Sequence, residues 1–223
     1  MPRLAVFDLD GTLIDTAPDL VDTTNVVLEA RGLAAVPAEI IVDHIGVGAR
    51  VMVASAMAEH GITVDDATMD KIHAEYLAHY ATRLARLSRA FPEILAALPK
   101  LKADGVTLAV CTNKREDMAR QLLGELGLMD EFVVLTGGDT FAFSKPDARH
   151  LLETIALAGG DPANTVFVGD SRIDFETAQN AKIPMVGLSY GYSDVPMAEL
   201  GPDALCKPGE DIAAAILGLF PAA

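Results

Sequence analysis

Short runs of apolar residues, separated by longer segments with helical patterns, constrain the fold of this chain more than any other feature. A strand with one face in water alternates apolar and polar residues, whereas these runs show almost no alternation. Strands that are buried on both faces of a parallel sheet have this pattern. The runs span residues 4–7, 107–110, 132–135, 165–168 and 185–188.

The segments between the later runs carry the signals of crossover helices. Residues 115–127 form a helical pattern that ends at Gly127, and Pro146 opens a second pattern that ends at the glycine pair 159–160. Strands and helices that alternate in this way indicate βαβ units. We therefore predict an α/β fold in which helices cover both faces of a doubly wound parallel sheet.

The interval between the first and second runs breaks this rhythm. Residues 8–106 contain no convincing strand and are instead divided by Pro and Gly into successive helical segments. One of them is predicted as a long helix with an apolar stripe, from Asp65 to about Arg89. We predict an α-helical cap domain at residues 16–82, inserted into a core domain formed by residues 1–15 and 83–223.

The charge balance and the apolar segments exclude several classes of partner. The chain has 17 Lys and Arg against 32 Asp and Glu, a formal net charge of −15, which would repel a nucleic acid backbone. The N-terminal segment is too short for a secretory signal, and no apolar run approaches the ~18 residues of a membrane span. We expect a cytoplasmic protein that binds neither nucleic acid nor membrane. Cys111 and Cys206 lack disulfide or zinc spacing and are predicted to be buried thiols.

Polar side chains follow four of the apolar runs, at the points where the predicted strands end. The carboxyl ends of parallel strands meet at one edge of the sheet, where ligands bind at the switch in strand order. We therefore expect these side chains to converge although they are far apart in the sequence. They are Asp8 and Asp10 after the first run, Thr112 and Asn113 after the second, Lys145 after the third, and Asp170 and Asp174 after the fourth.

Four carboxylates at one edge raise an electrostatic problem. If they were all ionised at about 6 Å spacing, their repulsion would total roughly 15 kcal/mol at an effective dielectric of about 20. This energy is comparable with the stability of a whole domain. The cluster therefore needs bound protons or a cation, and oxygen ligands of this kind favour a hard ion such as Mg²⁺.

The groups around this predicted metal site favour phosphoryl transfer. A carboxylate can attack phosphorus when cations neutralise the incoming phosphoryl group, and Asp8 is the candidate nucleophile. Asp10 is close enough to protonate the leaving oxygen and then to activate water. Thr112 and the backbone N–H of Asn113 are placed to hold phosphoryl oxygens, and Lys145 to offset the developing negative charge.

Four ordered motifs also carry a family resemblance. The stretches "DLDGTLIDT", "CTN", "SKP" and "GDSRID" resemble the motifs of the haloacid dehalogenase-like hydrolases. The cap inserted just after the first motif resembles the phosphoglycolate phosphatase subgroup. The resemblance implies a Rossmann-like core, an aspartyl-phosphate intermediate at Asp8, acid/base catalysis by Asp10, and phosphate contacts from Thr112 and Lys145.

The same resemblance implies a set of metal ligands. In this family, magnesium is held by the side chain of Asp8, the backbone carbonyl of Asp10 and the carboxylate of Asp170. Asp174 is implied as a further ligand or as a partner of the ligands. In the cap, Gly48 and Arg50 are candidate contacts for the far end of the substrate, although a simple helix junction explains that segment equally well.

We predict a magnesium-dependent phosphatase of small phosphate monoesters, with phosphoglycolate as the leading substrate by resemblance. The expected partner is a small phosphorylated metabolite, and the chain is expected to be a monomer or a homodimer. Two alternatives remain open. A β-phosphoglucomutase-like phosphotransferase would use the same pair, Asp8 and Asp10, and would differ in how its cap excludes water. A receiver-type module would use a phosphorylated Asp, a Thr and a Lys as a switch and not for catalysis.

Overall fold

The computed structural model describes residues 2–221, so Met1 and residues 222–223, the outermost ends of the predicted core domain, lie outside the described residues. A six-stranded sheet has the order β5-β4-β1-β6-β7-β8, and every neighbouring pair is parallel. After β1 the chain adds β4 and β5 on one side of it, and then returns to add β6, β7 and β8 on the other side. The strand order therefore switches direction beside β1. The strands are β1 (Arg3–Phe7), β4 (Val106–Cys111), β5 (Val134–Thr136), β6 (Thr165–Gly169), β7 (Met185–Leu188) and β8 (Ala204–Cys206).

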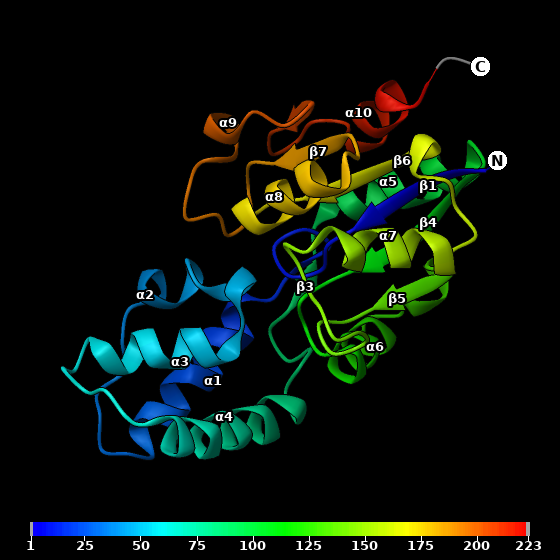
Figure 1. Cartoon of the computed structure of the whole chain (residues 1–223). Helices are drawn as coiled ribbons and strands as arrows, with labels where there is room; N and C mark the ends of the chain where they lie inside the picture. Colours follow the sequence, from blue (N-terminus) through cyan, green and yellow to red (C-terminus); the bar gives the residue numbers. More distant parts are fainter. Residues whose placement is uncertain (1, 222–223) are drawn as a thin grey trace.

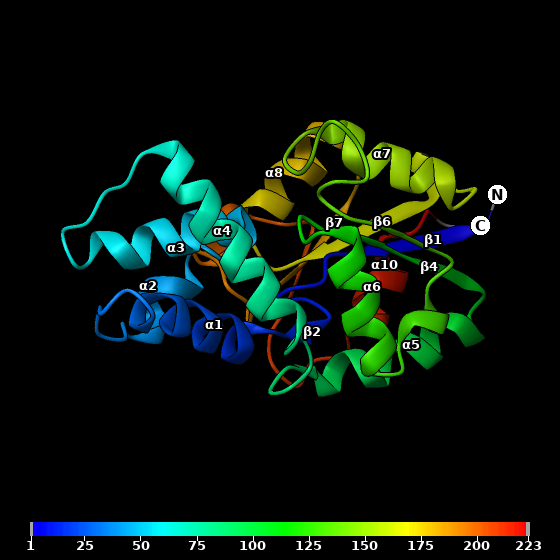
Figure 2. The same ribbon diagram turned by 90° about the horizontal axis from the view of Figure 1, so that it is seen from below.

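Helices cover both faces of this sheet, which confirms the predicted α/β fold (Figures 1 and 2). On one face, Leu151 and Ile155 pack with Phe167 of β6 in a buried cluster. On the other face, Ile94, Leu122 and Ile216 pack in the larger hydrophobic cluster. The first face carries α7 (Ala148–Leu157), α8 (Arg172–Ala181) and α9 (Met197–Leu200); the second carries α5 (Pro92–Ala103), α6 (Glu116–Glu125) and α10 (Ile212–Leu219).

A second group of helices lies apart from the sheet, at the left of Figure 1. These helices are α1 (Ala17–Glu29), α2 (Ala38–Val42), α3 (Ala49–Ala58) and α4 (Asp66–Ala81), with a 3-10 turn at Ile45–Val47. They occupy the segment for which we predict a cap, whereas the domain division at residues 16–82 stays a prediction. Two further 3-10 turns, Met129–Glu131 and Pro162–Asn164, lie in the core.

Two short strands join the inserted helices to the core, which the sequence did not indicate. The strands β2 (Ile14–Asp15) and β3 (Arg89–Ala90) pair antiparallel where the chain leaves the core and where it returns. The long helix was predicted to reach about Arg89, but α4 ends at Ala81. The buried carboxylate of Asp19 on α1 accepts hydrogen bonds from the backbone N–H groups of Leu87 and Ser88, which holds this stretch in a non-helical path.

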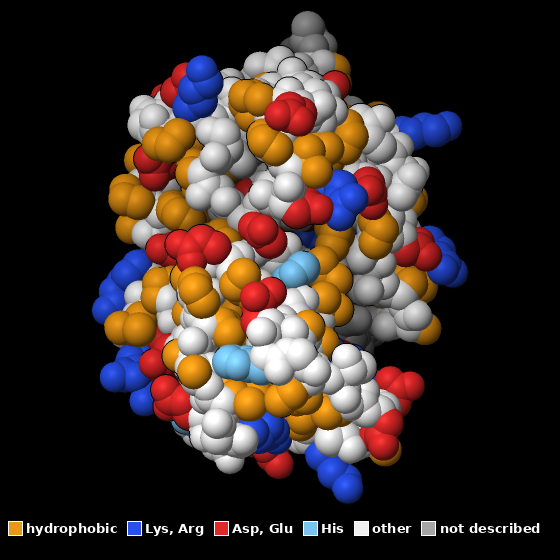
Figure 3. Space-filling view, turned by 90° about the vertical axis from the view of Figure 1, so that its left-hand side faces the viewer, with side chains coloured by type: hydrophobic (Ala, Val, Ile, Leu, Met, Phe, Trp, Pro, Cys, Tyr) orange, Lys and Arg blue, Asp and Glu red, His pale blue; other side chains and the backbone are white. Residues whose placement is uncertain are grey.

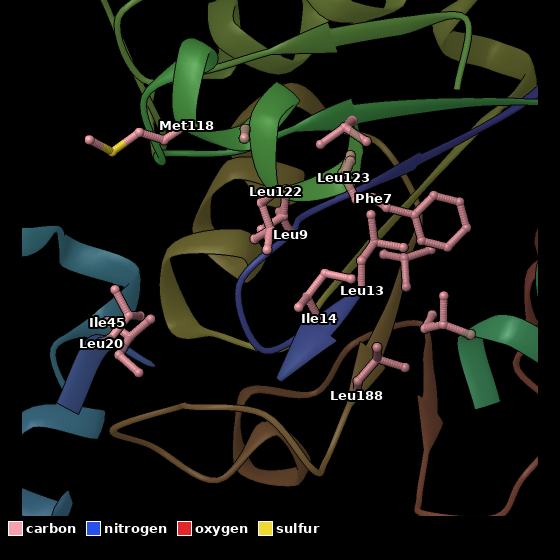
Figure 4. Close-up of a cluster of buried hydrophobic side chains, with 14 of the residues drawn as sticks. Phe7, Leu9, Leu13, Ile14, Leu20, Ile45, Met118, Leu122, Leu123 and Leu188 are labelled. Carbon is pink, nitrogen blue, oxygen red and sulfur yellow. The ribbon is translucent and has the colours of Figure 1, made fainter. Parts of the chain in front are cut away.

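The hydrophobic core continues from the sheet into the inserted helices. Figure 4 shows Leu20 and Ile45 on the inserted segment and Phe7, Leu9 and Leu13 within the core, and all five belong to one cluster of buried residues. The inserted helices are therefore packed against the carboxyl edge of the sheet. This contact places their side chains over the ends of β1 and β4.

The two cysteines, the start of β5 and a buried histidine can be compared with the sequence interpretation. Cys111 and Cys206 are free and buried, as predicted. The third run was expected to be a strand from residue 132, but β5 begins at Val134, because Phe132 turns into the core and Val133 is 62% exposed. His150 is fully buried, and its ring lies edge-on to the ring of Phe141 with 5.8 Å between the ring centroids. Within residues 2–221, no helix is both long and apolar enough to cross a membrane.

Candidate active site

The loop after β1 brings the backbone against a carboxylate from β6. Gly11 has a φ of +83°, a conformation that glycine adopts without strain. A Cβ atom at this position would lie 2.4 Å from Oδ2 of Asp170, so the close approach requires glycine. Thr12, the next residue, donates a hydrogen bond from Oγ1 to Oδ1 of Asp170 at 2.6 Å. The Gly and Thr of the "DGT" stretch thus both contact the carboxylate of Asp170.

A second loop encloses Asp170 from the other side. The backbone N–H of Tyr192 donates to Oδ2 at 2.7 Å, and a Cβ atom at Gly191 would lie 2.1 Å from the same oxygen. Sequence reasoning did not identify Gly191 or Tyr192, because the loop after β7 carries no charged residue at that point. Its Gly-Tyr-Ser sequence indicates only a turn.

Asp174 lies in the first turn of α8 and its side chain faces inward. Its Oδ2 accepts hydrogen bonds from the Ser171 side chain at 2.6 Å and the Ser171 backbone at 3.1 Å, completing a capping box. Its Oδ1 accepts from Nζ of Lys145 at 2.6 Å. The helix start therefore fixes the orientation of Asp174, and a lysine from the third motif neutralises its charge.

Lys145 lies between two of the predicted acidic residues. Its Nζ is 2.7 Å from Oδ1 of Asp8 and 2.6 Å from Oδ1 of Asp174. Burial lowers the pKa of Lys145, but the charges of Asp174 and Asp8 outweigh burial and raise it overall, so this lysine stays charged. The side chain of Asn113 holds the lysine backbone by two hydrogen bonds, to the carbonyl at 3.1 Å and from the N–H at 3.0 Å. Asn113 was predicted to act through its backbone, and the structure adds this role for its side chain.

Asp8 and Asp170 are both buried, and burial raises the pKa of both carboxyl groups. Burial, with a further contribution from Asp174, raises the pKa of Asp8 to about 7. Burial, followed by the charges of Asp174 and Asp8, raises the pKa of Asp170 well above its usual value. Oδ1 of Asp8 contacts Lys145 without hydrogen-bond angles and has no hydrogen-bond partner among the described residues. Without a cation, the site therefore retains protons, as the repulsion between its carboxylates requires.

Three of the predicted carboxylates form a cluster that fits a metal ion. Asp8, Asp170 and Asp174 each offer a buried oxygen, and these oxygens lie within 4.8 Å of one another. Such an all-oxygen donor set suits a hard divalent cation, and Oδ1 of Asp8, which forms an ion pair with Lys145 but accepts no hydrogen bond among the described residues, is one of the candidate ligand atoms. The side chain of Asp10 is not part of this cluster.

Asp10 instead faces a different set of partners. Its Oδ1 accepts hydrogen bonds from Oγ1 of Thr16 at 2.7 Å and from Nζ of Lys114 at 3.0 Å. The same ammonium group donates to the hydroxyl of Tyr80, on α4, at 2.7 Å. Sequence reasoning missed Lys114 and Tyr80. Lys114 directly follows the "CTN" motif, which was an available signal, whereas Tyr80 lies in a segment that was predicted only as a long helix with an apolar stripe.

A cavity of about 290 Å³ opens onto these residues between the core and the inserted helices. Its wall includes Asp8, Asp10, Thr112 and Lys145 from the core. Thr112 is buried, and its Oγ1 accepts a hydrogen bond from the backbone N–H of Lys114 at 3.2 Å. A ligand that enters this cavity would meet the carboxylate of Asp8, the hydroxyl of Thr112 and the ammonium group of Lys145 together.

The inserted helices supply the remaining wall. Gly48 and Arg50, the candidate contacts of the predicted cap, both line the cavity. Arg50 is paired with Asp66 at 2.9 Å and with Asp70, and its side chain is 38% exposed, so it lies at the rim. Its contact with a substrate stays a prediction. Figure 3 shows the side of the molecule on which the inserted helices lie, and acidic, basic and hydrophobic side chains are interspersed on it.

Comparison with known proteins shows which family and which relatives this chain is similar to. Residues 5–188 match the family model described as haloacid dehalogenase-like hydrolase. The chain is 46% identical to the phosphoglycolate phosphatase of Agrobacterium fabrum over 97% of this chain and 92% of the relative. It is 36% identical to the phosphoglycolate phosphatase of Caulobacter vibrioides over 96% and 90% of the two chains. A crystal structure of a predicted phosphoglycolate phosphatase from Haemophilus somnus 129PT superposes with a TM-score of 0.87 at 29% identity, covering 96% of each chain.

Proposed function

The chain belongs to the haloacid dehalogenase-like hydrolases, and from that premise we propose that it is a magnesium-dependent phosphatase of small phosphate monoesters, with phosphoglycolate as its leading substrate. The buried carboxylate of Asp8 carries this proposal, because it opens into the cavity beside Lys145 and Thr112. Relatives that are named phosphoglycolate phosphatase cover nearly the whole chain and support the choice of substrate.

The proposed reaction has two steps. In the first, an oxygen of Asp8 bonds to phosphorus while the bond from phosphorus to the ester oxygen breaks, and Asp10 donates a proton to the leaving oxygen. In the second, water attacks phosphorus, its proton passes to Asp10, and the bond between Asp8 and phosphorus breaks. Thr112 and Lys145 bind the oxygens of the phosphoryl group through both steps.

The residues present fit a bound cation. Asp8 and Asp170 would hold it through their carboxylates and Asp10 through its backbone carbonyl, with Asp174 beside them. When bound, the ion favours the ionised form of Asp8 and offsets the negative charge of the phosphoryl group. Magnesium suits the site because all of these donors are oxygens.

The inserted helices act as a cap over residues 16–82 in this proposal. They form one wall of the cavity through Ile45, Gly48 and Tyr80 and would limit the access of water during transfer. In this proposal the chain acts as a monomer or as a homodimer. The partner of the site is a small phosphorylated metabolite.

Phosphate release from a substrate panel tests this function. The panel contains phosphoglycolate, β-glucose 1-phosphate, pyrophosphate and a nucleotide, each with magnesium or with EDTA, beside an Asp8→Asn variant. The proposal expects magnesium-dependent release from phosphoglycolate that the variant lacks. Conversion of the sugar phosphate to an isomer without release would identify a mutase, and stable phosphorylation of Asp8 without turnover would identify a switch. Either result would overturn the phosphatase.

A further inference from the structure

Lys114 is a buried cation that has no role in the proposed reaction. It lies in the loop after β4, and its side chain is only 5% exposed. Its Nζ donates to Oδ1 of Asp10 at 3.0 Å and to the hydroxyl of Tyr80 at 2.7 Å, and it lies 4.6 Å from the centre of the tyrosine ring. The lysine thus connects the candidate acid/base residue to a helix of the predicted cap.

The metal cluster does not explain this lysine. Lys145 already neutralises Asp8 and Asp174, whereas the only ion pair of Lys114 among the described residues is with Asp10. An ammonium group is unfavourable in a buried site unless it is well paired. A second buried cation in the wall of the same cavity, paired with Asp10 and not with the metal cluster, points to an anionic group on the ligand.

The chemistry of the substrate indicates which group this is. This step rests on the proposed function, in which Asp10 protonates the ester oxygen and must lie within about 3 Å of it. In the phosphate ester of a 2-hydroxy acid, the carboxylate carbon is two bonds from that oxygen, which places the carboxylate oxygens about 3 Å beyond it. Lys114 Nζ lies 3.0 Å from Asp10, so such a carboxylate falls within hydrogen-bond reach of it.

Other cations that line the cavity are less suited to this role. Arg50 is engaged by Asp66 and Asp70, and Arg115 is paired with Asp117 at 3.2 Å and is 48% exposed. All three cations have an acidic partner, but Arg50 and Arg115 are much more exposed to solvent than Lys114, which is buried beside Asp10. We propose that Lys114, positioned by Tyr80, binds the carboxylate of the leaving group and so restricts the enzyme to phosphate esters of short 2-hydroxy acids.

A pair of matched substrates isolates this interaction. In 2-hydroxyethyl phosphate a neutral CH₂OH group replaces the carboxylate of phosphoglycolate, while the ester oxygen and the phosphate are unchanged. The wild-type enzyme should prefer phosphoglycolate in kcat/KM by about 100-fold, as expected for a charge-assisted hydrogen bond in a desolvated site. Lys114→Met should reduce this preference to within about threefold, while Lys114→Arg should retain part of it. Lys102→Met removes a half-exposed lysine of α5 that is paired with Glu131 and should leave both substrates unaffected.

The outcomes separate this inference from the function on which it rests. No phosphate release from any monoester by the wild type would refute the phosphatase itself. Release from both substrates with equal kcat/KM, or an equal loss on both in Lys114→Met, would leave the phosphatase intact and refute the carboxylate contact, because the lysine would then only position Asp10. Loss of the preference in Arg50→Met but not in Lys114→Met would also overturn it.

A binding measurement covers the case in which Lys114→Met does not fold. Tyr80→Phe removes only the hydroxyl that contacts Lys114, and it should raise KM for phosphoglycolate at least threefold more than it raises KM for 2-hydroxyethyl phosphate. In the Asp8→Asn background, calorimetry should show that phosphoglycolate binds more tightly than 2-hydroxyethyl phosphate and that Tyr80→Phe narrows the difference. Equal binding of the two ligands in that background would contradict the inference.

Discussion

Replacing Asp8 by Asn should stabilise the metal-free protein at alkaline pH. The pKa of this buried carboxyl is about 7 in the folded protein, against the ordinary value of 3.8 for an aspartate exposed to water. The folded state therefore binds a proton more tightly than the unfolded state, so the stability of the wild type falls as pH rises from about 4 to about 7. Asn keeps the shape of the side chain and does not titrate, and Lys145 retains its contact with Asp174.

The size of the expected change in the free energy of unfolding follows from the difference between the folded and unfolded pKa values of Asp8. A difference of about 3 pKa units at about 1.4 kcal/mol each gives ~4 kcal/mol over the full pH range. About half of it, roughly 2 kcal/mol, falls between pH 5.5 and pH 8, since the unfolded carboxyl is already ionised at pH 5.5. The free energy of unfolding of Asp8→Asn, relative to wild type, should therefore rise by about 2 kcal/mol between these two pH values.

Urea unfolding in EDTA at pH 5.5 and pH 8, for both proteins, measures this difference. A parallel series with saturating magnesium should shrink the advantage of the variant, because a bound cation stabilises the ionised form of Asp8 in the wild type. A stability difference that does not change with pH, or an Asp8→Asn protein that is less stable than wild type at pH 8 in EDTA, would refute the electrostatic reasoning.

Two other substitutions test the architecture around the site. Gly191→Ala places a Cβ atom 2.1 Å from Oδ2 of Asp170 and should weaken magnesium binding, measured by calorimetry, by tenfold or more. The control Gly218→Ala, whose Cβ atom would have no neighbour within 4 Å, should leave the magnesium affinity unchanged. Equal affinities in the two variants would exclude a tight enclosure of Asp170. Asp19→Ala leaves the backbone N–H groups of Leu87 and Ser88 without their acceptor and should lower the free energy of unfolding, measured in urea, by about 3 kcal/mol. A loss below about 1 kcal/mol would show that these hydrogen bonds do not fix the path of the chain at Leu87 and Ser88.

The central fold was predictable because burial on both faces leaves a strong local signal. The strands β1, β4, β6 and β7 all coincide with unbroken apolar runs. The short strand β8 at the sheet edge has only one of its three residues buried, so it carries no such run. The early end of α4 depends on Asp19, a residue far away in the sequence, and periodicity alone extends the helix too far.

The candidate site was predictable to the extent that its residues follow strand ends. Asp8, Asp170 and Lys145 converge as parallel topology requires. Gly191 and Tyr80 could not be assigned from the sequence, because their roles depend on which loop and which helix the fold brings to the cavity. The resemblance to the haloacid dehalogenase-like hydrolases is confirmed by the family match over residues 5–188.

The most direct test of the account is to trap the phosphorylated protein during a single turnover. Enzyme in excess is mixed with ³²P-labelled phosphoglycolate and magnesium, quenched in acid within milliseconds, and digested for peptide mapping. The account predicts a transient, acid-stable label on the peptide that contains Asp8, formed before free phosphate and missing in Asp8→Asn. Phosphate release without any labelled protein, or undiminished release by Asp8→Asn, would contradict an aspartyl-phosphate at this residue.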